Sequence, residues 1–136
     1  MALPNGGGGY QLGDGNLNEI TLGYAPAPSA YTADADVVLT VAELEGGLIL
    51  YTQTGTSNFQ LPLVAGAGGV DAEISSAKVG STFDFFFIST STGVGTITVN
   101  TGWTLVGSGA TPASGIGAYF RARKTGDGTY TCYRVA

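Results

Sequence analysis

Histidine is absent from this chain, and cysteine occurs once, at Cys132. Nucleophilic hydrolases commonly activate a serine or cysteine with an imidazole base, so a chain without histidine cannot build such a site by itself. Zinc sites are usually built from histidines or several thiolates, which are missing as well. The sequence therefore argues against these two kinds of catalysis, and it predicts that Cys132 is a small buried apolar residue.

Two pairs of carboxylates remain as candidates for acid–base chemistry, namely Asp34 with Asp36 and Glu43 with Glu45. Residues two apart in a strand share a face at roughly 6–7 Å, a separation that glycosidase carboxylates also show. This spacing is common, however, and charged residues near loop ends are usually solvated. We expect no enzyme activity and no small-molecule substrate.

Residues 14–18 (DGNLN) resemble the opening of a calcium loop, because alternate oxygen-bearing side chains can converge on a cation. The rest of such a loop is missing, since Glu19 stands where glycine is required and Ala25 where glutamate is required. The four glycines at 6–9 are not a phosphate-binding loop, because no Gly-Lys-Ser/Thr follows them. No metal or cofactor is expected.

Composition and charge point to a surface that faces other protein. Charged residues make up only 11% of the 136 residues, against roughly 25% in ordinary soluble domains, and the net charge is −5. Residues 1–84 carry nine acids and one base, whereas residues 85–136 carry four bases and one acid. These bases are either solvated strand positions or complementary to neighbouring copies. Nucleic acid is a poor partner for five bases, and no stretch approaches the roughly 18 apolar residues of a membrane span.

Residues 1–31 predict an extended, glycine- and proline-rich N-terminal arm. Its apolar residues are spaced through it, and those at 20, 22 and 24 alternate as in a strand, so we expect the arm to order against a partner or neighbouring subunit. The partner-binding residues expected in the arm are Tyr10, Leu12, Leu17, Ile20, Leu22 and Tyr24.

Residues 32–136 predict one β-domain. Strand-like runs lie at 37–41, 48–51, 58–63, 83–88, 96–100, 103–106, 118–124 and 129–135. A hairpin loop is expected at 89–95, a tight turn at 126–128, a helical turn at 41–45 and the best helix at 71–78, capped by Asp71. Run 83–88 is apolar on both faces and should lie centrally. The predicted fold is all-β: a single antiparallel, jelly-roll-like β-sandwich with one short helix and the extended arm.

Aromatic residues near the C-terminus, Trp103, Tyr119, Tyr130 and Tyr133, could stack on sugars or bases if exposed. They are scattered among small residues, so packing in the core or between subunits is favoured.

Segments 39–50 (LTVAELEGGLIL), 78–88 (KVGSTFDFFFI) and 96–99 (TITV) resemble capsid decoration (cement) proteins and related virion β-domains of tailed bacteriophages. The resemblance covers most of residues 33–107 and consists of strand patterns. The basic cluster Arg121, Arg123 and Lys124 has no counterpart in it.

The resemblance implies a trimer on the capsid exterior, assembled in the host cytoplasm, which clamps neighbouring major capsid subunits and stabilises the head. Several weak contacts per trimer then act together through avidity. Expected oligomer or capsid contacts are Phe86, Ile88, Arg121, Arg123 and Lys124. The alternative is a phage receptor-binding or fibre-tip domain with carbohydrate affinity.

Overall fold

The structure, a computed structural model, describes residues 25–110 and 115–136, which form nine strands and two short helices. The all-β expectation is confirmed, and each predicted strand is present, although the runs expected at 37–41 and 58–63 are shortened to Val37–Val38 and Ser57–Gln60. The strands are β1 Ser29–Tyr31, β2 Val37–Val38, β3 Leu48–Tyr51, β4 Ser57–Gln60, β5 Thr82–Ser89, β6 Gly95–Thr98, β7 Trp103–Val106, β8 Gly117–Gly126 and β9 Thr129–Arg134; the helices are α1 Val41–Gly46 and α2 Val70–Glu73.

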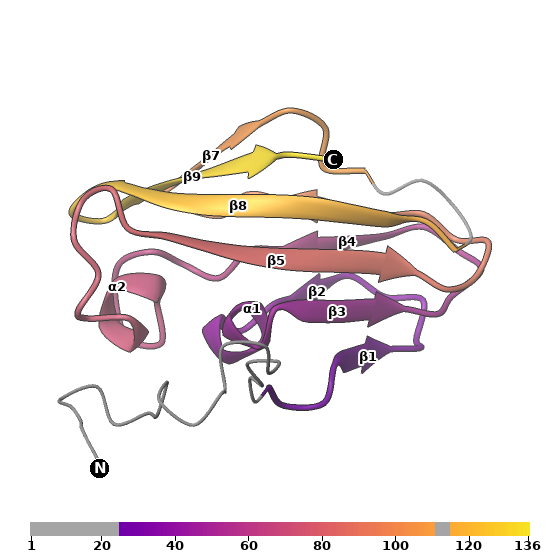
Figure 1. Cartoon of the computed structure of the whole chain (residues 1–136). Helices are drawn as coiled ribbons and strands as arrows, with labels where there is room; N and C mark the ends of the chain where they lie inside the picture. Colours follow the sequence, from indigo (N-terminus) through magenta and orange to yellow (C-terminus); the bar gives the residue numbers. More distant parts are fainter. Residues whose placement is uncertain (1–24, 111–114) are drawn as a thin grey trace, which may run out of the picture.

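The strands form two sheets with mostly parallel pairing. The six-stranded sheet has the order β1-β3-β5-β8-β9-β7 (Figure 1), and the three-stranded sheet has the order β2-β4-β6. Only the β5/β8 and β8/β9 pairs are antiparallel. The antiparallel expectation is therefore wrong for the other pairs, and the jelly-roll sandwich is not confirmed. The central position expected for run 83–88 is confirmed, because β5 lies between β3 and β8.

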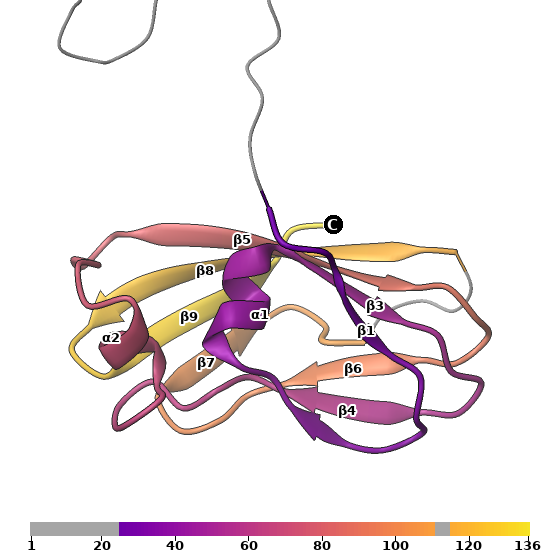
Figure 2. The ribbon, with the colours of Figure 1, turned by 90° about the horizontal axis from the view of Figure 1, so that it is seen from below.

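Four of the five parallel pairs arise because the chain winds in three coils. Each coil places one strand in the six-stranded sheet and the next in the three-stranded sheet: β1 then β2, β3 then β4, β5 then β6 (Figure 2). Each coil lies beside the previous one, so like strands run in the same direction. The hairpin expected at 89–95 is wrong for this reason, because β5 and β6 belong to different sheets.

A short repeat marks the corner between the two strands of the second and third coils. Residues 52–55 read TQTG and residues 90–93 read TSTG, and five residues separate the strands in both coils. Backbone hydrogen bonds join the stacked corners, from Gly93 N to Gln53 O at 2.9 Å and from Thr90 N to Tyr51 O at 2.8 Å. Sequence analysis missed this repeat, which is the local sign of the coiled path.

Aromatic rings fill the space between the two sheets. The ring of Phe59, from β4, lies 5.2 Å from that of Tyr51 in β3 and 4.8 Å from that of Phe87 in β5, and all three side chains are fully buried. Burial of three such rings provides a large part of the hydrophobic driving force for joining the sheets. Trp103 and Tyr130 are also buried, which confirms core packing for these two aromatics.

Two helices are present where one was expected. The helical turn predicted at 41–45 is α1, which Thr40 caps through its hydroxyl and Gly47 ends with a φ of 82°. The helix predicted at 71–78 is wrong in extent, because α2 covers only Val70–Glu73 and its N-cap is Gly69. Asp71 does not cap this helix. Its carboxylate instead accepts hydrogen bonds from Lys124 Nζ at 2.8 Å and from the Gly128 N–H at 2.7 Å.

The last residues of the expected arm belong to the sheet, because Ser29–Tyr31 form β1 and pair with β3. Residues 25–28 precede this edge strand and are exposed. The six apolar residues assigned to partner binding in the arm, from Tyr10 to Tyr24, lie outside the described residues. The division expected at residue 31 stays a prediction.

Candidate functional site

The carboxylates of Asp34 and Asp36 join the first coil to the second through hydrogen bonds. Asp34 accepts a hydrogen bond from the Gly55 N–H at 3.3 Å, and Asp36 accepts one from the Asn58 N–H at 2.8 Å. Each aspartate of the first coil thus binds backbone of the second coil. This arrangement explains their spacing structurally.

Glu43 and Glu45 differ in their surroundings although both lie on α1. Glu43 accepts hydrogen bonds from the Thr40 N–H at 2.9 Å and from the Tyr31 hydroxyl. Burial opposes ionisation of Glu43, but these hydrogen bonds outweigh it and hold the pKa of the carboxyl below its usual value. Glu45 is exposed. Among residues 25–110 and 115–136, no three His, Cys, Asp or Glu side chains gather as metal ligands would.

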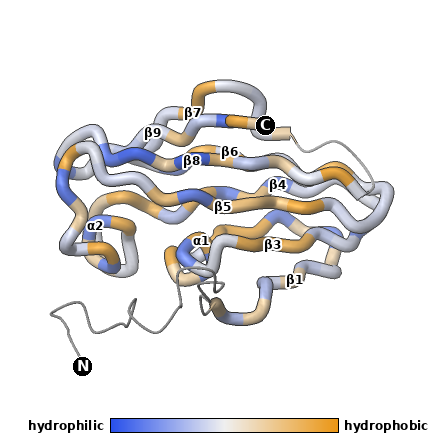
Figure 3. Tube along the Cα trace, in the orientation of Figure 1, coloured by the Kyte–Doolittle hydropathy of each residue, from blue (hydrophilic) through white to orange (hydrophobic). Residues whose placement is uncertain are grey.

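The outer face of the six-stranded sheet, which points away from the three-stranded sheet, is the most distinctive surface. Strand alternation buries Phe85 and Phe87 and turns Phe86 outward, where it remains 46% exposed. Hydrophobic residues are concentrated along the neighbouring β3 and β5, and hydrophilic residues on β8 (Figure 3). We define the outer face by Leu48, Leu50, Asp84, Phe86, Ile88, Tyr119, Arg121, Arg123, Tyr133 and Val135.

An apolar row crosses this outer face. Leu48 pairs with Phe86, and Phe86 with Tyr119, across three adjacent strands. The Phe86 and Tyr119 rings are stacked with their centroids 4.7 Å apart. The row continues to Val135, which is 53% exposed and donates its backbone N–H to Tyr119 O at 2.8 Å. We call Leu48, Phe86, Tyr119 and Val135 the apolar row.

An ion pair lies next to the apolar row. Arg121 donates to both carboxylate oxygens of Asp84, from Nε at 2.7 Å and from Nη2 at 3.0 Å, and the Tyr119 hydroxyl also donates to Asp84. Hydrogen bonds hold the pKa of the Asp84 carboxyl below its ordinary value. The Arg121 guanidinium has the largest effect, and the Tyr119 hydroxyl has the next largest. Both charged side chains are substantially exposed, so the pair orients the groups more than it stabilises the fold.

The predicted contact residues separate into two groups. Phe86, Arg121 and Arg123 are exposed on the outer face, and Ile88 is half-buried there. Lys124 is only 7% exposed and points to the opposite side of β8, toward Asp71. Strand alternation therefore separates Lys124 from Arg121 and Arg123, and the structure does not place it on the outer face.

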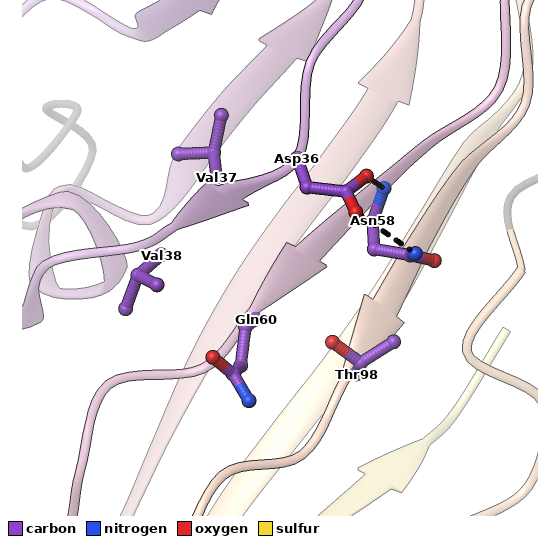
Figure 4. A pocket seen from close by; sticks show the side chains of 6 residues that line it. All are labelled: Asp36, Val37, Val38, Asn58, Gln60 and Thr98. Atoms are coloured by element: carbon purple, nitrogen blue, oxygen red, sulfur yellow. Dashed lines mark hydrogen bonds between the residues drawn. The ribbon is translucent and has the colours of Figure 1, made fainter.

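A shallow polar groove of about 270 Å³ lies on the exposed side of the three-stranded sheet (Figure 4). Its lining side chains come from all three strands and the preceding turn: Asp36, Val37, Val38, Asn58, Gln60 and Thr98. Both carboxylate oxygens of Asp36 accept hydrogen bonds from Asn58, and Gln60 donates to Val99 O at 3.2 Å. Among the residues that the structure describes, none of those lining this groove is aromatic.

Cys132 is fully buried, and burial raises the pKa of its thiol to about 12. The prediction of a buried apolar position is confirmed. Trp103 donates its indole N–H to Pro62 O at 2.7 Å, which satisfies this group in the core. Tyr119 and Tyr133 are half-buried on the outer face.

No family model, curated protein or solved structure matches this chain. No helix in the described part of the chain is long and apolar enough to cross a bilayer.

The apolar row combines residues that sequence analysis identified with others that it missed. Phe86 was singled out because its strand is apolar on both faces. Leu48 and Val135 became neighbours of Phe86 and Tyr119 only through strand order and register. Alternation along β8 was the available signal that places Tyr119 and Arg121 together and Lys124 apart from them.

Proposed function

We propose that this chain is a virion structural protein, a capsid decoration protein that stabilises the head by bridging major capsid subunits. It attaches as a homo-oligomer, with three copies as the arrangement that the sequence resemblance favours. The observation that carries the proposal is the exposed apolar row on the outer face, flanked by Arg121 and Arg123.

The composition of this face is that of a protein-binding surface. Aromatic residues and arginine are enriched at protein interfaces, whereas lysine and glutamate are depleted. Phe86 and Tyr119 present a rigid stacked pair, which loses little side-chain entropy on binding. Arg121 is already held by Asp84, so its unused donors are fixed in direction.

Binding to phage heads tests the proposal. Heads from particles that lack this protein, prepared by deleting its gene, are mixed with the purified full chain and sedimented. We expect the chain to sediment with the heads, and Phe86→Ser to weaken binding by roughly tenfold or more, the effect of losing about 1.4 kcal/mol.

Val79→Ser is the matched control, because Val79 is 61% exposed but lies in the loop before β5. This variant should bind as the wild type does. Failure of the wild-type chain to bind such heads, or equal losses in the two variants, contradicts the proposal.

A second candidate function is a receptor-binding or fibre-tip domain with carbohydrate affinity. The polar groove favours it, because amide and hydroxyl groups of Asn58, Gln60 and Thr98 are placed together on one open surface. Glycan-array binding that is lost in Gln60→Ala and retained in Phe86→Ser would favour this function over the first.

A further inference from the structure

The apolar row is an uncovered stripe that needs an apolar partner. Phe86 and Val135 are 46% and 53% exposed, and the half-buried Leu50 and Ile88 lie beside the row as direct neighbours across β3 and β5. A contiguous exposed apolar patch of this kind usually marks a contact site.

The described chain begins beside one end of this row. Pro26 and Ala27 line a shallow pocket together with Gly46 and Leu48, the first member of the row. Figure 2 shows the indigo start of the described chain and the C-terminus on the same side of the molecule, at the six-stranded sheet. The described chain therefore begins next to the outer face.

The sequence just before residue 25 matches the row in spacing and chemistry. Ile20, Leu22 and Tyr24 are apolar at every second position, which places their side chains on one side of an extended segment. From residue 20 to residue 24 such a segment spans about 13 Å, and four adjacent strands span about 14 Å at their usual separation.

The charges of the two surfaces are also complementary. Residues 1–24 contain Asp14 and Glu19 and no lysine or arginine. The outer face carries Arg121 and Arg123 against Asp84. Glu19 directly precedes the apolar positions, so a segment placed on the row brings its carboxylate to this basic side of the sheet.

We propose that residues 17–24 of one copy lie across the outer face of a second copy, with Ile20, Leu22 and Tyr24 on the apolar row. This inference rests on the proposed function, because it supplies the copy-to-copy contact that an oligomeric structural protein needs.

Photo-crosslinking of the full chain tests the exchange. Leu22 is replaced by benzoylphenylalanine, and unlabelled copies are mixed with copies labelled with ¹⁵N before irradiation. We expect crosslinked peptides that join residue 22 to residues 82–89 or 117–126, with the two isotopes combined in one product. Products confined to a single isotope, products on the three-stranded sheet, or no products at all would overturn the proposal.

Two variants of the receiving copy sharpen the test. Phe86→Ser should reduce the crosslink roughly tenfold, which corresponds to about 1.4 kcal/mol of lost contact, whereas Val79→Ser should leave its yield unchanged. Equal yields from both variants would overturn the assigned site. The experiment uses no phage heads, so a chain that crosslinks as expected but fails to bind heads contradicts the proposed function alone.

Discussion

Gly93 lies where the third coil touches the second, and its missing side chain permits that contact. A Cβ atom at this position would lie 2.2 Å from Gly55 O and 2.5 Å from Gln53 O, both backbone atoms. We expect Gly93→Ala to lower the free energy of unfolding by roughly 1–3 kcal/mol, the usual cost of overpacking. Urea unfolding measures the change.

Gly117→Ala is the control for this substitution. Its Cβ atom would meet Ile88 Cγ1 at 3.3 Å, a contact that a small side-chain movement can relieve, and Phe87 O at 3.7 Å, an ordinary van der Waals distance. We expect a much smaller loss of stability than in Gly93→Ala, and comparable losses in the two variants would contradict the stacked-corner geometry.

Asp71 makes the stability of the fold depend on pH. The hydrogen bond from Lys124 is the largest cause that lowers the pKa of this carboxyl, and the Gly128 N–H adds to it. The folded protein therefore releases this proton more readily than the unfolded chain, whose aspartates have a pKa of about 4. The stabilisation is complete above that pH and is lost as the pH falls through the lower folded-state pKa.

Asp71→Asn should therefore be less stable than the wild type at pH 7, while the difference should shrink at pH 2–3. Urea midpoints at both pH values measure this effect. Glu45→Gln, on the exposed side of α1, should change the midpoint little at either pH. If Asp71→Asn lost the same amount of stability at both pH values, the charge of the Asp71 carboxylate would not be the cause of the loss.

At the scale of the element, β5 offers two adjacent phenylalanines with opposite surroundings. Phe87 is fully buried against Phe59 and Tyr51, whereas Phe86 is 46% exposed. Phe87→Ala should cost roughly 3–5 kcal/mol of folding free energy, and Phe86→Ala much less. Chemical denaturation of both variants gives the comparison, and similar costs would contradict the different burial of the two rings.

The strands were predictable from sequence because each is a short apolar or alternating run bounded by turn residues. Their pairing was not, since parallel and antiparallel neighbours need the same alternation. Residues 89–95 show the difficulty: Gly93 and the flanking threonines suit a hairpin, yet they form a corner between two sheets. Only comparison with residues 52–56 would have revealed the repeated coil.

The candidate site was predictable in part for the same physical reason. Phe86, Arg121 and Arg123 could be identified as outward residues from local alternation. Lys124 was grouped with the arginines because it is adjacent to them in sequence, although alternation places it with the buried Ala122 and Phe120. The ion pair of Arg121 with Asp84 depends on the antiparallel register of β5 and β8, which no local pattern specifies.

At the scale of the whole molecule, the two sheets bury one core and leave the apolar row in contact with solvent. An exposed apolar row of this kind is typical of a contact surface, and we propose that a partner covers it. Because the segment from a second copy would cover the apolar row, we expect Arg121 and Arg123 beside it to contact the head, and Phe86→Ser to weaken attachment through loss of the oligomer. A multivalent assembly can therefore hold through several moderate contacts.

Sedimentation velocity of the full chain across a wide concentration range tests this central claim most directly. We expect an oligomer, with a mass of three times the 13.7 kDa chain as the favoured value. Phe86→Ser should shift it toward monomer, while Val79→Ser should not. A wild-type chain that remains monomeric at every concentration, or an oligomer that is indifferent to Phe86→Ser, would contradict the account.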